Sequence, residues 1–182
     1  LKGFNLATKR QVLNLPISGA NMLNDIAIRD SNSLLVADGE TGLVLLVDLK
    51  KKSYYTFVAI DNTLGSLQNI ALDKKALYAS TFDKDQKKGR LLRIDIETKE
   101  VSIVHEFAEK ICGIALTNHG GIIVATEGHK NATKLYKIST NAKVYAIDID
   151  EDLQAPAKLL LDKQALWIPN TLNNQVQKIM PE

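Results

Sequence analysis

Two oxygen-bearing side chains, Asp25 and Asn69, are the sharpest candidates for chemistry in this sequence. Each stands directly before an isoleucine, and the two lie 44 residues apart. Carboxylate and amide oxygens are ligands that Ca²⁺ and Mg²⁺ prefer. If both side chains face one opening, they could share a divalent cation, with Asp25 also a candidate catalytic residue. Such a site needs at least two further ligands, and without them both residues are only polar residues at the opening.

A second candidate pair, Glu127 and His129, lies in the segment Glu127-Gly128-His129. An acid and an imidazole two residues apart could act in general acid–base catalysis if the loop is held over a site. The alternative is an ordinary solvated loop. The single cysteine, Cys112, has no sequence partner that would activate it, so we expect a small buried residue rather than a nucleophile.

The elements that would position these residues recur along the chain. Apolar residues that follow the candidate positions fall in steps of 44, 44 and 45, at Ile26, Ile70, Ile114 and Leu159. A second apolar marker recurs in steps of 43, 45 and 44, at Val36, Ala79, Val124 and Ile168. Two independent phases with one period, filled by short strand patterns, predict the blades of a β-propeller.

We therefore predict an all-β propeller of four-stranded antiparallel blades, in one domain over residues 1–182. About four blades are expected: full blades at 18–60, 61–107 and 108–150, the end of an earlier blade at 1–17 and a partial blade at 151–182. Glu106–Lys110 is the one segment that could form a helical turn.

The number of predicted strands leaves the size of the ring open between two alternatives. One is a compact four-bladed ring. The other, which we favour because residues 1–17 supply one strand too many for the first, is a six-bladed ring. In that case the missing blades come from a cleaved segment or from another chain, because an open end would leave an apolar sheet face in water.

In such a ring the loops before the innermost strands and after the second strands share one rim. We expect a binding site there for a small polar molecule or a protein partner, because ligands sit where polar groups converge on a concave mouth. Asn170 has the alternative role of a turn cap. The expected ligand-binding residues are Asn24, Gln68, Asn69, Cys112 and Asn170.

Composition excludes some classes of partner. The chain has 23 basic and 21 acidic residues, interspersed, so we expect no binding to nucleic acid. One cysteine excludes an internal disulfide and a cysteine metal cluster. No apolar run approaches the length of a transmembrane segment. We expect a soluble protein, and both the periplasm and secretion are compatible with this composition.

Several segments resemble a known group of propellers. Residues 166–179, LWIPNTLNNQVQKI, resemble the closing strands of NHL repeats. SLQNIALDKKALYAST, ICGIALTNHGGIIVAT and Ala155-Pro156-Ala157 resemble the six-bladed senescence-marker/gluconolactonase-like superfamily. The resemblance covers the whole chain, although its motifs specify blades rather than chemistry.

The resemblance implies a divalent cation at the channel mouth. The family's ligand positions fall on Gln68 and Cys112, and its Asn-Asp-Gly element falls on Asn24-Asp25 with Ile26 in place of glycine. Gln68 offers one neutral oxygen and Cys112 none. We therefore expect a binding module with an eroded hydrolase site. The alternative is an active metal-dependent lactonase or esterase that uses Ca²⁺ or another divalent cation.

Overall fold

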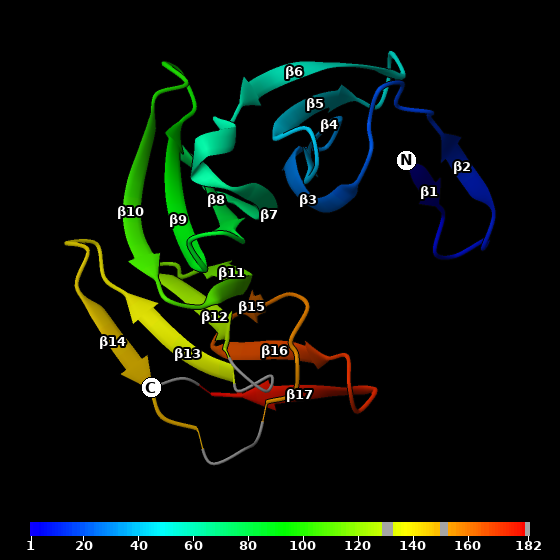
Figure 1. Ribbon diagram of the computed structural model, residues 1–182. Helices are drawn as coiled ribbons and strands as arrows, with labels where there is room; N and C mark the ends of the chain where they lie inside the picture. Colours follow the sequence, from blue (N-terminus) through cyan, green and yellow to red (C-terminus); the bar gives the residue numbers. More distant parts are fainter. Residues whose placement is uncertain (129–132, 150–152, 181–182) are drawn as a thin grey trace.

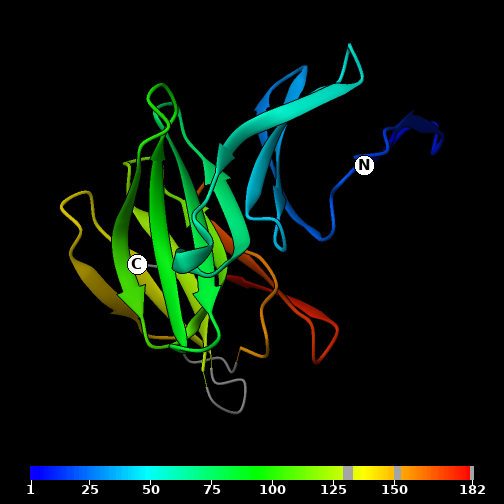
Figure 2. The same ribbon diagram turned by 45° about the horizontal axis from the view of Figure 1, so that its top comes forward.

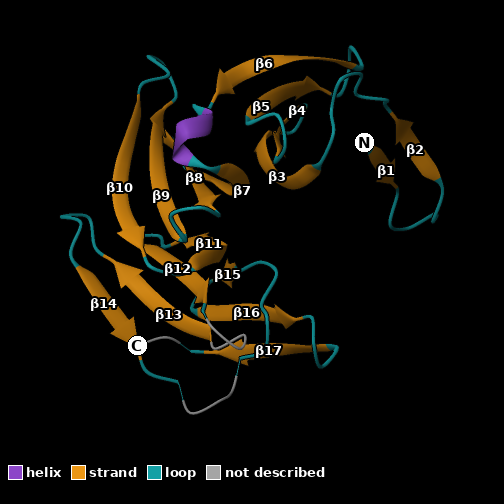
Figure 3. Cartoon of the chain, viewed as in Figure 1, coloured by secondary structure: helices purple, strands orange, loops and turns teal. Residues whose placement is uncertain are grey.

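The computed structural model describes residues 1–128, 133–149 and 153–180, and these residues form short antiparallel strands with one 3₁₀ turn, η1 (Asn62–Leu64) (Figure 3). Four sheets follow one another along the chain, and we call them blades I to IV. Blade I contains β3 (Leu23–Asp30), β4 (Ser33–Asp38), β5 (Leu43–Asp48) and β6 (Ser53–Ala59). Blade II contains β7 (Ser66–Leu72), β8 (Ala76–Asp83), β9 (Lys88–Asp95) and β10 (Val101–Phe107).

Blade III contains β11 (Lys110–Leu116), β12 (Ile122–Glu127), β13 (Thr133–Ile138) and β14 (Val144–Ile147). Blade IV has three described strands, β15 (Leu160–Asp162), β16 (Ala165–Asn170) and β17 (Gln175–Ile179). The remaining two strands, β1 (Lys2–Phe4) and β2 (Gln11–Asn14), pair with each other before blade I and stand apart from the other sheets (Figure 2).

The turns that join these strands are built by aspartates. Asp30, Asp48, Asp73 and Asp95 each end or follow a strand, and each carboxylate accepts a hydrogen bond from the backbone N–H two residues later. This local bond reverses the chain without help from distant residues, which is why short apolar segments separated by Asp-containing turns fold as hairpins.

The hydrophobic core is divided among the spaces between successive sheets. One cluster joins blades I and II, a second joins blades II and III, and a third joins blades III and IV. The segment that follows β2 packs on blade I, where Leu15 joins Val36 and Val47. In blade II, Leu92 packs toward blade I and Leu91 toward blade III, so both faces of the strand are covered. Strands buried on both faces are apolar along their whole length.

The innermost strands β3, β7, β11 and β15 surround a common channel, with the outer strands toward the periphery (Figure 1). Ile26, Ile70, Ile114 and Leu159 all line this channel. The repeat phase read from the sequence is therefore confirmed, and so is the prediction of an all-β propeller with about four blades.

One local prediction was wrong. Glu106 belongs to β10 and Lys110 to β11, so no helical turn forms between them. Pairing of Phe107 with Gly89 keeps this backbone extended and overrides its local preference. The 3₁₀ turn η1 was not predicted; Asp61 caps it by accepting a hydrogen bond from Thr63 N. With η1 the only described helical element, no helix in the described ranges could cross a membrane.

Candidate binding site at the channel mouth

A cavity of about 420 Å³ lies at the end of the channel where the innermost strands begin. Its lining comes from all four blades and consists of Met22, Asn24, Gln68, Asn69, Lys110, Cys112, Glu127, Ala155, Pro156, Ala157 and Thr171. Five of the residues predicted from the sequence are therefore brought together here: Asn24, Gln68, Asn69, Cys112 and Glu127. We call this space the mouth cavity.

Asn24 is fixed in the mouth cavity by a contact between blades. Its Nδ2 donates a 3.0 Å hydrogen bond to the carbonyl of Leu67. The side chain crosses directly over Gly39, where an added Cβ would lie 2.7 Å from the Leu67 oxygen and closer still to the Asn24 amide. Only glycine at position 39 leaves room for this arrangement.

Gln68 and Asn69 begin the channel-lining part of β7. The Gln68 Nε2 donates to the carbonyl and hydroxyl of Ser66, at 3.2 and 3.0 Å. The Asn69 Nδ2 donates to Ser80 Oγ at 3.3 Å and to the Ile111 carbonyl at 3.4 Å. Within the described part of the chain, no donor reaches Asn69 Oδ1, so this oxygen is available to a ligand.

Asp25 lies outside the lining of the mouth cavity and joins three blades. Its Oδ1 accepts from Ile26 N at 2.7 Å, and its Oδ2 accepts from Ile70 N in blade II at 2.9 Å. The ammonium of Lys158, at the start of blade IV, also contacts Oδ1. The Asp25 side chain is buried, and its two oxygens are occupied by these donors.

Asp25 and Lys158 belong to one set of equivalent positions, each directly before the channel-lining residue of its blade. Asn69 holds this position in blade II and Gly113 in blade III. Asn69 reaches the backbone of blade III, and a Cβ on Gly113 would lie 2.8 Å from Leu159 Cγ in blade IV. Each of the first three positions therefore lies against the next blade along the chain. Lys158, the fourth, contacts Asp25 in blade I.

Asn170 belongs to a second set of equivalent positions, at or near the end of the second strand. Its Oδ1 accepts from Gln154 N at 3.1 Å, and its Nδ2 contacts Gln177 Oε1. The other members, Asp38, Thr81 and Thr126, are also buried. Asp38 accepts from Asn21 N and Met22 N, both at 3.0 Å, and Thr81 Oγ1 donates to the Leu64 carbonyl at 2.6 Å. Thr126 likewise donates to Glu109. Each residue of this set therefore forms a hydrogen bond with the segment that precedes the innermost strand of its own blade.

Cys112 lines the mouth cavity as a neutral thiol. Burial, and after it the negative charge of Glu127, raises the pKa of the Cys112 thiol to about 12. Its Sγ donates to the Ala125 carbonyl at 3.3 Å. A thiol with this pKa is not a nucleophile near neutral pH, which agrees with the role expected from the sequence.

Glu127 is the one carboxylate among the described residues that line the mouth cavity. It ends β12 opposite Lys110, its cross-strand partner at the start of β11. The two charges face the same small space without a direct ion pair between them. His129, the other half of the predicted acid–base pair, lies outside the described residues, so its proposed role stays a prediction.

Among the residues that the structure describes, the side chains at the mouth cavity do not assemble the cation site that the resemblance implies. In the described ranges no three His, Cys, Asp or Glu side chains cluster as metal ligands. Asp25 is held by Lys158 and does not line the mouth cavity, whereas Asn69 does. A hard cation takes six to eight oxygens, and here Glu127 would supply the only described carboxylate. A cation shared by Asp25 and Asn69 stays a prediction.

Sequence reasoning missed part of the lining, namely Met22, Lys110, Thr171 and the segment Ala155–Ala157. Thr171 Oγ1 donates to the Ala155 carbonyl at 2.8 Å, and Pro156 pairs with Asn170, so the 155–157 segment lies along the edge of β16. The repeat offered one signal that could have pointed to Lys110. Lys110 lies two residues before Cys112, just as Ser66 lies two residues before Gln68, the equivalent mouth residue of the preceding blade.

No family model matches the chain, and no curated protein sequence matches it. Solved structures do resemble it. The structure of a nidogen/laminin complex gives a TM-score of 0.76 at 16% identity and covers 96% of this chain and 65% of that one. Streptogramin B lyase gives 0.67 at 14% identity, over 92% of this chain and 54% of that one. Hydrazine synthase of Kuenenia stuttgartiensis gives 0.66 at 14% identity, over 99% and 70%.

This chain thus spans about half to two thirds of the neighbouring chains' length. At these identities the similarity concerns the fold alone. Together with the blades and the shared channel, it identifies the chain as a β-propeller.

Proposed function

We propose that this chain is a propeller binding module whose mouth cavity takes a small polar molecule. One observation carries the proposal: side chains from three successive repeats, chosen from the sequence alone, converge on a single cavity of about 420 Å³. A space of this size holds a small metabolite.

The lining favours a ligand that is neutral or zwitterionic. Asn24, Gln68 and Asn69 offer amides that both donate and accept hydrogen bonds. Lys110 and Glu127 add one positive and one negative charge across the same space. A ligand carrying complementary groups of both signs would satisfy both, whereas a large apolar body would leave these polar groups unpaired.

Binding is favoured over hydrolysis by the state of the two most reactive candidates. The Cys112 thiol is protonated near neutral pH, and the Asp25 carboxylate is held by Lys158 and two backbone N–H groups. The alternative function remains a metal-dependent lactonase or esterase. The named neighbours include enzymes and a protein complexed with laminin, so the fold does not choose between a ligand, a substrate and a protein partner.

The test is a thermal-shift screen of the purified chain with free amino acids, monosaccharides and their charged derivatives. At least one compound is expected to raise Tm through specific binding. The shift should be lost in Glu127→Gln and kept in the matched control Glu97→Gln, which lies in an exposed turn. If no compound shifts Tm, or if the two variants respond alike, the proposed site is wrong.

A separate assay tests the hydrolase alternative. Chelator-treated protein is given a simple lactone or ester, with and without added CaCl₂. Calcium-dependent turnover that disappears in Asp25→Asn would favour the lactonase and overturn a role limited to binding. Absence of turnover in both conditions is the result we expect.

We also propose that the described blades belong to a larger, six-bladed ring, completed by a cleaved segment or by another chain. The neighbours' greater length supports this, as does apolar exposure on the innermost strand of blade I, where Ile28 is 76% exposed. Native mass spectrometry of the protein from its own source tests it. A species of the chain's own 20.1 kDa, with no companion polypeptide, would favour the compact ring.

A further inference from the structure

A second cavity, of about 460 Å³, lies between blades III and IV at the end of the channel opposite the mouth. We call it the inter-blade pocket. β11 begins at the mouth with Lys110 and ends at Leu116, and the turn that follows supplies Thr117, Asn118 and His119. The matching turn after β15 supplies Lys163 and Gln164 from the other side.

The floor of the inter-blade pocket is apolar. Ile123 from β12, Leu161 from β15 and Met180 after β17 line it. Ile123 is almost fully buried and packs with Leu161 in the interface between the two blades, whereas Met180 is 58% exposed. A ligand that fits this surface needs a short apolar body.

The rim of the pocket is basic and rich in donors. His119, Lys137 and Lys163 line it, and among the described residues none of the lining side chains is a carboxylate. In the described part of the chain, no hydrogen bond or ion pair engages His119, Lys163 or Gln164. Thr117 Oγ1 already accepts from Gly121 N at 2.9 Å, which leaves its own proton to donate.

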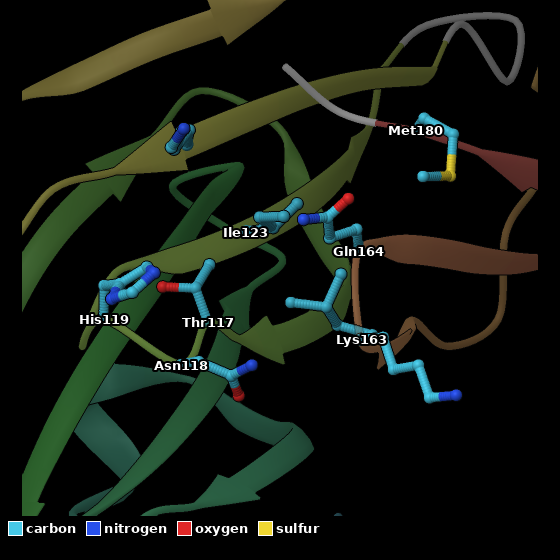
Figure 4. A pocket seen from close by; sticks show the side chains of 9 residues that line it. Thr117, Asn118, His119, Ile123, Lys163, Gln164 and Met180 are labelled. Carbon is cyan, nitrogen blue, oxygen red and sulfur yellow. The ribbon is translucent and has the colours of Figure 1, made fainter.

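Figure 4 shows how these groups lie. The Thr117 hydroxyl points toward the His119 ring, and Gln164 reaches from blade IV toward Ile123 on blade III. The Lys163 side chain extends away from His119. Because a lysine has a long flexible stem, its ammonium can turn to a bound anion at the rim.

A comparison with the other blades explains the sign of the charge. The turn after the innermost strand opens with Asp30 in blade I, Asp73 in blade II and Asp162 in blade IV, but with Thr117 in blade III. The inter-blade pocket is therefore lined from the blade III side by a hydroxyl where the repeat elsewhere has a carboxylate. Asp162 precedes Lys163 but is not among the lining residues.

We propose that the inter-blade pocket binds a small organic anion, with its charged head at His119 and Lys163 and a short apolar body against Ile123, Leu161 and Met180. This site is separate from the mouth cavity and does not depend on the function proposed there. A carboxylate and a phosphate monoester share this chemistry, and the experiment distinguishes them.

The test is an NMR titration of the 182-residue chain with butyrate, n-butyl phosphate, inorganic phosphate and the neutral butyramide at constant ionic strength. Saturable shifts of the Thr117–Gly121 and Lys163–Gln164 amides are expected with butyrate or butyl phosphate, and the tighter of the two identifies the head group. Inorganic phosphate should bind at least about 5-fold more weakly because it lacks an apolar body.

Lys163→Asn removes the charge at a left-handed backbone position (φ 58) that asparagine tolerates, and it should weaken binding at least about 5-fold. Lys52→Asn is the matched control, because Lys52 is an exposed turn lysine with φ 52 that lies outside this pocket. The Lys52→Asn variant should bind the anion as tightly as the unchanged chain. The proposal is overturned if no saturable shift occurs, or if butyramide or inorganic phosphate binds as well as the tighter of butyrate and butyl phosphate. Equal affinities of the two lysine variants would overturn it too.

Discussion

Blades II and IV are built from the same repeat but bury very different amounts of apolar surface. In blade II, Leu92 is fully buried between blades I and II. In blade IV, Leu160 on the innermost strand is 62% exposed and Val176 on β17 is 64% exposed. Blade II has a neighbour on each face, whereas the described core of blade IV faces only blade III. The number of neighbouring sheets, rather than residue type, therefore decides which apolar side chains stabilise the fold.

The largest effect is expected from a substitution in the central blade. Leu92→Ala should lower the free energy of unfolding by about 3–4 kcal/mol, because it opens a cavity in a packed core. Leu160→Ala should cost less than about 1 kcal/mol, because most of that side chain is already in water. Urea denaturation of both variants measures the difference. Equal losses would show that another sheet covers blade IV in solution.

A smaller effect is expected at the contact that joins the terminal blades. Asp25→Ala should destabilise the chain by about 2–4 kcal/mol, because it leaves the buried Ile70 N–H without its acceptor and frees Lys158. Lys158→Gln removes only the partly exposed cation and should cost about 1 kcal/mol. Urea denaturation with intrinsic Trp167 fluorescence reports on blade IV specifically. If the Lys158 variant loses as much free energy of unfolding as the Asp25 variant, the stability of blade IV depends on this ion pair more than on packing.

The equivalent positions Asp38 and Asn170 differ in charge, which predicts a pH dependence for one and not the other. Burial raises the pKa of Asp38, but hydrogen bonds from Met22 N and Asn21 N outweigh it and hold the pKa below its usual 3.8. A depressed folded-state pKa stabilises the fold above about pH 4, and this contribution disappears as the pH falls through the folded value.

Asp38→Asn should therefore cost about 1 kcal/mol at pH 7 and progressively less below pH 4. Thermal unfolding of both forms between pH 2.5 and 7 tests this. Asn170→Asp serves as the converse comparison, because it introduces a carboxylate at the equivalent position of blade IV. A loss from Asp38→Asn that stays constant over this range would contradict the assignment.

The smallest effect concerns chemistry at Cys112, in the interface between blades III and IV. With a pKa of about 12, only about one thiol in 10,000 is ionised at pH 8. Labelling by a thiol reagent should be at least about 100-fold slower in the native chain than in urea, because burial also limits access. Rapid native labelling would mean that blade IV separates easily from blade III. The difference in stability between blade IV and the fully covered blade II would then be larger than the burial indicates.

The sequence by itself determined the repeated architecture. A strand pattern with Asp-containing turns depends on neighbouring residues, and a period of about 44 aligns equivalent positions without knowledge of distant contacts. For this reason Asn24, Gln68, Asn69 and Cys112 could be predicted to meet at one mouth, and the structure brings them there.

Only the tertiary structure decided which polar atoms remain available to a ligand. Asp25 was the sharpest candidate from the sequence, yet its oxygens are held by Lys158, 133 residues away, and by Ile70 N. The 155–157 segment reaches the mouth cavity only because Asn170 and Thr171 bind it along β16. Partners so distant in sequence leave no local pattern, because their contacts arise from the packing of one blade on the next.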